Sequence, residues 1–213
     1  MIPMKNILCY GDSNTWGYIP GGKGRYEYAV RWTGAAQRLL GDGYRIIEEG
    51  LNGRTTVFDS PFDGSVLNGK SHLMCCLMSH APLDAVVIML GTNDLMHSHT
   101  AWEASRGCIT LSRMVMNGAL HFNAHMPRLL LVSPIHIGRE IAETDQSPLS
   151  VSGYEESLKF APLYEQAAAR IGIDFLDAAK YAEPSPADNE HMDAEGHAAL
   201  AAAIADKLKT MLG

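Results

Sequence analysis

The sequence predicts an α/β protein, a three-layer α/β/α sandwich around a five-stranded parallel sheet with strand order 2-1-3-4-5. Short continuous apolar runs, the pattern of strands buried on both faces, recur along the chain. Segments with helical spacing separate these runs, an alternation typical of parallel βαβ units. A length of 213 residues with 46% hydrophobic residues is enough for a sizeable core, and no linker-like or low-complexity segment divides the chain. We therefore expect a single domain over residues 1–213.

The first strand is expected at residues 7–10, an apolar run that ends abruptly at Gly11. A helix is expected over residues 33–40, with Thr33 as its N-cap. The second strand follows at residues 44–48. These elements begin the alternation that the rest of the chain continues.

The remaining elements repeat the pattern of helix and strand. In order, they are a helix over residues 71–80, a strand over 85–90, a helix over 101–117, a strand over 128–132, a helix over 154–170, a strand over 173–176 and a helix over 194–212. Asp193 is a suitable N-cap for the last helix. Because βαβ crossovers are right-handed, five such strands favour the flavodoxin-like order, in which the first strand is central.

Composition limits the classes of partner. A formal net charge of −7, with no basic run of five or more residues, predicts no nucleic-acid partner and no anionic membrane surface, so we expect a small molecule. The four cysteines, Cys9, Cys75, Cys76 and Cys108, form no CxxC pair, which favours reduced, mostly buried thiols in a cytoplasmic protein. The opening segment has no signal-peptide cleavage site, and no apolar stretch is long enough to span a bilayer.

Polar segments follow the expected strands. Residues 11–14 follow the first strand, residues 49–56 the second and residues 91–94 the third. Residues 188–191 come after the fifth strand and a Pro-rich loop. The carboxyl ends of parallel strands meet at the edge where open α/β sheets bind ligands. We therefore expect these four segments to converge on one site.

Ser13 is the candidate nucleophile, and it needs a base to take its proton. His191 is the candidate base, since imidazole has an ordinary pKa of about 6.5. Asp188 lies three residues before His191, so one loop could bring its carboxylate to the imidazole and stabilise the imidazolium. The alternative is that Gly-Asp-Ser-Asn is ordinary turn chemistry without a catalytic role.

Negative charge develops on the carbonyl oxygen when a serine attacks an ester, so preorganised donors must face that oxygen. The backbone N–H groups of Ser13 and Gly53 and the side-chain amide of Asn93 could supply three donors. Arg54 is expected to anchor its loop through hydrogen bonds. Neighbouring residues are candidates for the substrate pocket: Asp12, Trp16, Asn52 and Thr92. Trp16 could equally pack against its own helix.

Other histidines compete for the role of base or metal ligand. His197 also follows acidic residues, but Asp193 as an N-cap would place His197 in the first turns of the last helix, away from the strand ends. We therefore interpret His197 as structural. His97 and His99 have no convincingly spaced third ligand, so the sequence predicts neither a metal nor a cofactor.

Four blocks occur in order along the chain: Gly11-Asp12-Ser13-Asn14, Gly53, Gly91-Thr92-Asn93-Asp94 and Asp188-Asn189-Glu190-His191. Together they resemble the SGNH hydrolases, also called the GDSL esterase/lipase superfamily. The resemblance places the family's catalytic serine, glycine and asparagine at Ser13, Gly53 and Asn93. The family's histidine and aspartate correspond to His191 and Asp188.

Further segments resemble the arylesterase/acyltransferase branch of this superfamily. They include Gly11-Asp12-Ser13-Asn14-Thr15-Trp16-Gly17, Arg31-Trp32-Thr33-Gly34, Glu48-Glu49-Gly50-Leu51, Arg54-Thr55-Thr56 and Leu67-Asn68-Gly69. Members of that branch cleave short-chain and aryl esters, some transfer acyl groups to alcohols, and several assemble as oligomers. The resemblance implies a serine esterase for small acyl esters, a capacity for acyl transfer, and a homo-oligomer.

Two alternatives stay open from the sequence. A carbohydrate acetyl esterase would use the same residues, and activity on acetylated sugars above that on aryl acetates would favour it. A flavodoxin-like binding module for FMN or another phosphate ligand belongs to a different class of protein. Against this module, Asp12 in the first loop should repel a phosphate, and nothing in that loop resembles a phosphate cradle.

Overall fold

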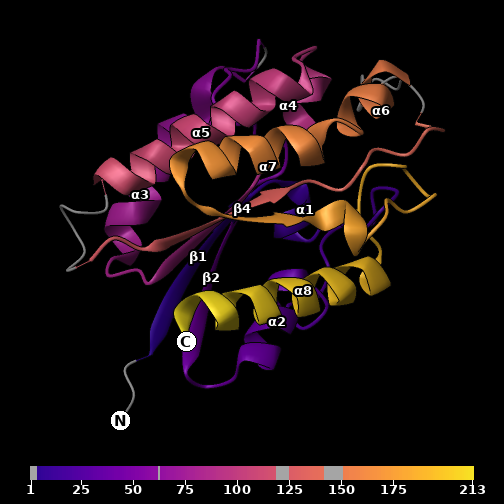
Figure 1. Ribbon diagram of the computed structural model, residues 1–213. Coiled ribbons are helices and arrows are strands. Elements are labelled where there is room, and N and C mark those ends of the chain that lie inside the picture. The colour runs from indigo at the N-terminus through magenta and orange to yellow at the C-terminus, as the bar shows by residue number, and fades with distance from the viewer. Residues whose placement is uncertain (1–3, 62, 119–124, 142–150) are drawn as a thin grey trace.

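The computed structural model describes residues 4–61, 63–118, 125–141 and 151–213. Its centre is a five-stranded parallel sheet with the order β2-β1-β3-β4-β5, which confirms the predicted fold class (Figure 1). The strands are β1 (Lys5–Gly11), β2 (Tyr44–Gly50), β3 (Ala85–Met89), β4 (Arg128–Ser133) and β5 (Asp174–Asp177). Their limits lie within two residues of the predicted ones.

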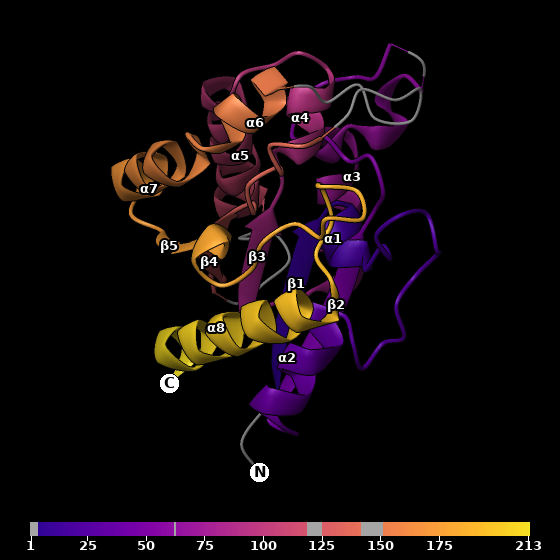
Figure 2. The ribbon, with the colours of Figure 1, turned by 90° about the vertical axis from the view of Figure 1, so that its right-hand side faces the viewer.

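Helices cover both faces of the sheet and complete three layers (Figure 2). One face carries α2 (Trp32–Leu40) and α8 (Ala194–Leu212), and the other carries α3 (Gly69–His80), α5 (Ala101–Gly118) and α7 (Phe160–Ile171). In β1, Ile7 and Cys9 pack into the first layer, while Leu8 and Tyr10 pack into the second. All four side chains are buried, which is why this strand shows a continuous apolar run.

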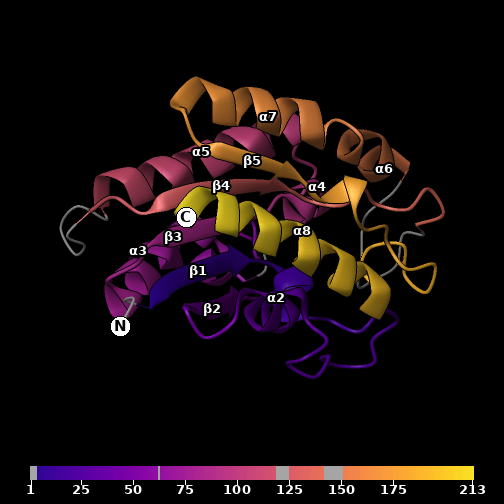
Figure 3. The same cartoon turned by 60° about the horizontal axis from the view of Figure 1, so that its bottom comes forward.

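Short helices lie in the loops. They are α1 (Ser13–Trp16), α4 (Thr92–Met96), α6 (Val151–Ser157) and the 3-10 helices η1 (Ser65–Leu67) and η3 (Ala178–Lys180). In Figure 3, α4 and α6 lie at the end of the sheet toward which the strand arrows point. The sequence predicted no helix at α1 or α4, because helices this short show no apolar periodicity. Among the described helices, none is both long enough and apolar enough to cross a membrane.

The prediction of one continuous helix over residues 154–170 is wrong, because the helix is interrupted between α6 and α7. Pro162 has no backbone N–H to donate to the carbonyl of Leu158, and its ring would clash there. A new helix beginning at Phe160 instead places Pro162 in its first turn, where it is tolerated. Ser157 is the last residue of α6, and its hydroxyl accepts the N–H of Ile137 at 3.0 Å.

The N-cap predicted for the helix over residues 33–40 is also wrong. Helix α2 begins one residue earlier, at Trp32, and Arg31 occupies the N-cap position without a side-chain capping bond. Thr33 lies inside the first turn and is fully buried. Its hydroxyl donates to the carboxylate of Glu48 on β2, so this side chain bonds across to the sheet rather than to its own helix end.

Candidate active site

The nucleophile segment turns directly from strand into helix, since β1 ends at Gly11 and α1 begins at Ser13. A Cβ on Gly11 would lie 2.1 Å from Thr15 Oγ1, so only glycine fits this close approach. Asp12 is the N-cap of α1, and its Oδ1 accepts the N–H of Asn14 at 3.0 Å. Ser13 therefore stands at the end of the central strand with its backbone held by a capped helical turn.

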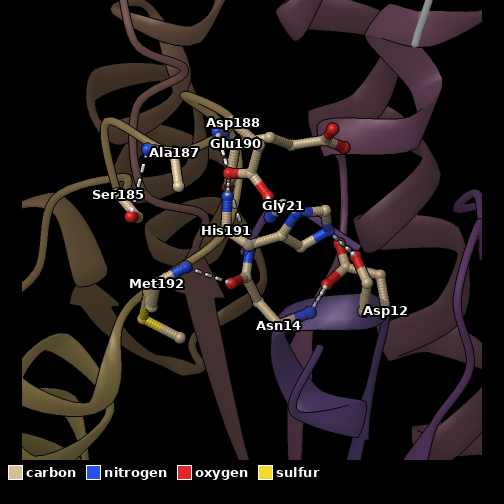
Figure 4. Close-up of polar contacts among 10 residues, drawn as sticks. Asp12, Asn14, Gly21, Ser185, Ala187, Asp188, Glu190, His191 and Met192 are labelled. Atoms are coloured by element: carbon tan, nitrogen blue, oxygen red, sulfur yellow. Dashed lines mark hydrogen bonds and ion pairs between the residues drawn. The ribbon is translucent and has the colours of Figure 1, made fainter. Parts of the chain in front are cut away.

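Ser13, His191 and Asp188 form a hydrogen-bonded chain, as the sequence led us to expect. His191 Nε2 lies 2.9 Å from Ser13 Oγ. His191 Nδ1 lies 2.9 Å from Asp188 Oδ2, and both of these residues are labelled in Figure 4. The fold brings Ser13 and His191 together across 178 residues of sequence. Both residues are largely shielded, at 6% and 8% exposed. This is the geometry in which an imidazole can take a serine proton.

The carboxylate of Asp188 is held by donors on both oxygens. Its Oδ1 accepts the backbone N–H groups of Glu190 and His191, at 3.1 and 3.0 Å. Its Oδ2 accepts the N–H of Gly21 at 3.0 Å as well as the imidazole. Burial alone would raise the pKa of Asp188, but its hydrogen bonds with His191 and Glu190 and the charge of His191 outweigh it and lower that pKa to about 2. Asp188 is therefore ionised at neutral pH.

The hydrogen bond between Asp188 and His191 also changes the basicity of the imidazole. Burial would lower the pKa of His191, yet the hydrogen bond to Asp188 and the neighbouring charges of Glu190 and Asp188 raise it above 6.5. Tyr18 packs its ring against the imidazole, with centroids 4.4 Å apart. The loop that carries Tyr18 and Gly21 thus touches both His191 and Asp188, a contact that sequence spacing did not indicate.

Two of the three expected oxyanion donors, Gly53 and Asn93, follow the strands that flank β1. Gly53 comes after β2 and has a φ of +76°, the left-handed region that favours glycine. Asn93 lies in the first turn of α4, after β3, and is buried. Its Nδ2 donates to the carbonyl of Arg54 at 3.1 Å, and because an amide carries two hydrogens, the second remains for another acceptor. The strand order thus places a candidate donor on either side of Ser13.

Arg54 anchors its loop, as expected from the sequence. Its buried guanidinium lies 4.0 Å from the centre of the Tyr10 ring. It donates to the carbonyl of Gly11 at 2.9 Å and also to the carbonyl of Glu49. This one side chain therefore ties the loop after β2 to the end of β1, and it holds the carbonyl group that Asn93 contacts.

Asp94 holds the loop after β2 at a second point, Thr56. It accepts the backbone N–H of Thr56 at 3.0 Å and the hydroxyl of Thr56 at 2.5 Å. Burial raises the pKa of Asp94 to about 7, against the opposing effect of these hydrogen bonds. The loop between β2 and α3 is thus bonded to α4, next to Asn93.

Asn14 is a site residue that the sequence reasoning missed. Its Oδ1 accepts the N–H of Met192 at 3.0 Å, and its Nδ2 contacts the carbonyl of Glu190 at 3.4 Å. Figure 4 shows Asn14 reaching from α1 to the segment that carries His191. Its partners are backbone atoms, which have no sequence signature, so only its place beside Ser13 could have drawn attention to it.

The candidate pocket residues differ in their surroundings. Asp12 and Thr92 are buried and line one narrow gap together with Ile135. Burial raises the pKa of Asp12 to about 6. Trp16 is partly buried, with the guanidinium of Arg25 lying 4.8 Å from its ring centre. Asn52 is exposed. A role for each in substrate binding stays a prediction.

His197 lies in the first turn of α8, as expected. Asp193 caps this helix by accepting the N–H of Gly196 at 2.8 Å. His197 is fully buried, its Nδ1 accepts the N–H of Trp32 at 3.2 Å, and burial lowers its pKa to about 4. These contacts join α8 to α2, which is a structural role.

His99 stacks on Phe58 with ring centroids 3.6 Å apart.

Comparisons with known proteins relate the chain to one family and to several solved structures. Residues 9–199 match the model of the GDSL-like lipase/acylhydrolase family. The structure of a carbohydrate acetylesterase from Sinorhizobium meliloti is 38% identical, covers 97% of this chain and 99% of that chain, and superposes with a TM-score of 0.90. The aryl esterase of M. smegmatis is 34% identical over 98% of this chain and 100% of that chain, with a TM-score of 0.91. No curated protein sequence matches at a significant level.

Proposed function

This chain belongs to the GDSL-like lipase/acylhydrolase family, and on that premise we propose that it is a serine esterase acting on short-chain acyl esters, acetyl or aryl. The observation that carries the proposal is the chain of two 2.9 Å contacts from Asp188 through His191 to Ser13. A nucleophile, a base and an orienting carboxylate are the groups that acyl transfer through a covalent intermediate requires.

In the acylation step, the oxygen of Ser13 attacks the carbonyl carbon of the ester while its proton passes to His191 Nε2. Asp188 stabilises the imidazolium that forms. The N–H groups of Ser13 and Gly53 and the amide of Asn93 stabilise the negative charge on the carbonyl oxygen. The alcohol or phenol then leaves with the proton from His191, and an acyl group stays on Ser13.

In the second step, His191 takes a proton from an incoming water or alcohol, whose oxygen attacks the acyl carbon. The bond between the acyl carbon and the Ser13 oxygen then breaks, and His191 returns the proton to Ser13. Water gives hydrolysis and releases a carboxylic acid, whereas an alcohol gives a new ester. Acyl transfer is thus part of the proposal, and it needs only that an alcohol compete with water for the acyl-enzyme.

Acetylated carbohydrates are a second candidate substrate class. The relative from Sinorhizobium meliloti is a carbohydrate acetylesterase, and another structure described as a family member from that organism is 38% identical with a TM-score of 0.92. A higher kcat/KM on acetylated sugars than on phenyl and p-nitrophenyl acetate would favour this class. The reverse order would favour aryl esters, as in the relative from M. smegmatis.

The deciding experiment compares p-nitrophenyl acetate turnover by the wild type, Ser13→Ala and His191→Ala. We expect each substitution to lower kcat by about 10⁴–10⁶-fold, because the nucleophile and base act as one unit. His197→Gln is the matched control, since it removes a buried imidazole of the same chain but keeps an acceptor for Trp32, and it should stay active.

Circular dichroism of each variant shows whether the fold is intact. If folded wild type turns over acetyl, butyryl and sugar acetates no faster than Ser13→Ala, the esterase proposal fails. The flavodoxin-like binding module then becomes the better reading.

A further inference from the structure

Helix α3 presents His72, Cys76 and His80 at intervals of four residues. Residues four apart lie above one another on the same side of a helix, so these three side chains form a line. Cys76 is buried, at 3% exposed, whereas His72 is exposed and His80 is partly buried. One helix face therefore combines a thiol with two imidazoles.

Glu49 faces this line from the sheet. It lies on β2 directly beside Tyr10 of β1, and its Oε1 is 2.9 Å from His80 Nε2. The ligand atoms of Glu49, His72 and Cys76 all lie within 4.8 Å of one another. Three different ligand types, from a strand and from two turns of a helix, thus converge on one point at the border of the core.

We propose that Glu49, His72 and Cys76 form a binding site for a Zn²⁺-type divalent transition-metal ion. Thiolate and imidazole are the ligands that such ions prefer, and a carboxylate oxygen is an accepted third ligand. Tetrahedral ligands with metal–ligand bonds of about 2.0–2.3 Å lie roughly 3.3–3.6 Å apart, so the three atoms must draw closer by up to about 1.5 Å. The exposed side chain of His72 can make that adjustment without disturbing the core.

Binding is an exchange of a proton for the ion. A cysteine thiol ordinarily has a pKa of about 8.5, so without the ion the sulfur of Cys76 carries its proton at neutral pH. The incoming cation forms a bond to the sulfur and releases this proton to solvent, with no change in oxidation state. Three protein ligands leave a fourth position, which a water molecule can fill from the side of His72.

His80 acts as a positioning residue in this site. Its contact with Glu49 orients the carboxylate, and partners of this kind tune the affinity of a metal site without touching the ion. The ion would join α3 to the end of β2. The site uses none of the residues of the proposed esterase mechanism.

The test uses metal-free protein titrated with Zn²⁺ in a calorimeter and with Co²⁺ in a spectrophotometer. Co²⁺ bound to a thiolate gives a charge-transfer band in the near ultraviolet, which reports the Cys76 bond directly. We expect one ion per chain in the wild type. Cys76→Ala should abolish the band, and His72→Ala should weaken binding by about 100-fold or more, while His80→Gln should weaken it by about 10-fold.

Cys75→Ser is the matched control, because it removes the adjacent exposed thiol of the same helix and should leave both signals unchanged. His72 is exposed, so its replacement does not threaten folding, and a loss of binding there can be assigned to the site. A wild type without the Co²⁺ band, or a band that survives in Cys76→Ala, would overturn the proposal. Neither readout depends on esterase activity.

Discussion

Asp188 controls the basicity of His191 through a 2.9 Å hydrogen bond and its charge. Only the neutral imidazole can accept the proton of Ser13, so kcat/KM should rise with pH as His191 loses its own proton. Because the pKa of His191 is raised, the midpoint of this rise should lie above 6.5. A pH profile of kcat/KM for an acetyl ester measures it, and a flat profile between about pH 5 and 8 would point to another base.

Asp188→Asn is the control for this profile. The substitution removes the charge that raises the pKa of His191, so the midpoint should move to lower pH. It also replaces one carboxylate oxygen with an NH2 donor, which can hold the imidazole in the wrong tautomer, and kcat should fall by about 10⁴-fold. A lower kcat with an unmoved midpoint would mean that Asp188 only holds the loop.

Asn93 should contribute to transition-state stabilisation through its amide. Asn93→Ala is expected to lower kcat by about 10²–10³-fold, or about 3–4 kcal/mol, with a smaller effect on KM. The variant also loses the contact with the Arg54 carbonyl, so its thermal unfolding must be measured alongside. A folded variant with a tenfold loss or less would remove Asn93 from the oxyanion hole.

At the scale of elements, Asn14 joins α1 to the segment that carries His191. Asn14→Ala leaves the buried N–H of Met192 without its acceptor, which should lower the free energy of unfolding by about 1–3 kcal/mol. Urea unfolding measures the change. Asn52→Ala, at an exposed position in another loop of the site, should change stability by no more than about 0.5 kcal/mol. Equal effects from both variants would contradict the joining role.

At the scale of the whole molecule, His197 links folding to pH. Its pKa is about 4 when folded and about 6.5 when unfolded, so between these values the unfolded chain binds the extra proton. The stability due to the neutral imidazole is therefore complete above about pH 6.5 and is lost as pH falls toward 4. From about 1.4 kcal/mol per pH unit, the loss amounts to about 3 kcal/mol.

Urea unfolding of the wild type and His197→Gln at pH 8 and pH 5 tests this prediction. The wild type should lose more stability than the variant between the two conditions. Asp12 and Asp94 have raised pKa values of about 6 and 7, so they act in the opposite direction and favour the folded state as pH falls. Both proteins contain them, and their effect cancels in the comparison. If both proteins lose the same free energy of unfolding between pH 8 and pH 5, His197 does not titrate on unfolding.

The sequence by itself determined the strands, their order and the residue types of the candidate site. Burial on both faces of a parallel sheet demands continuous apolar runs such as residues 7–10, and right-handed crossovers leave few possible orders. The polar segments after these strands could then be assigned to one edge. Local signals also placed Asp193 as a helix cap and His197 inside that helix.

Only the tertiary structure decided which distant groups touch. The N–H of Gly21 on Asp188, the link from Asn14 to Met192, and the convergence of Glu49 on Cys76 join segments through particular atoms. Many of these partners are backbone groups, which every residue type shares, so no sequence pattern can identify them. Contact between distant segments depends on how the loops close over the sheet, and that closure is set by the packing of the whole chain rather than by any local spacing.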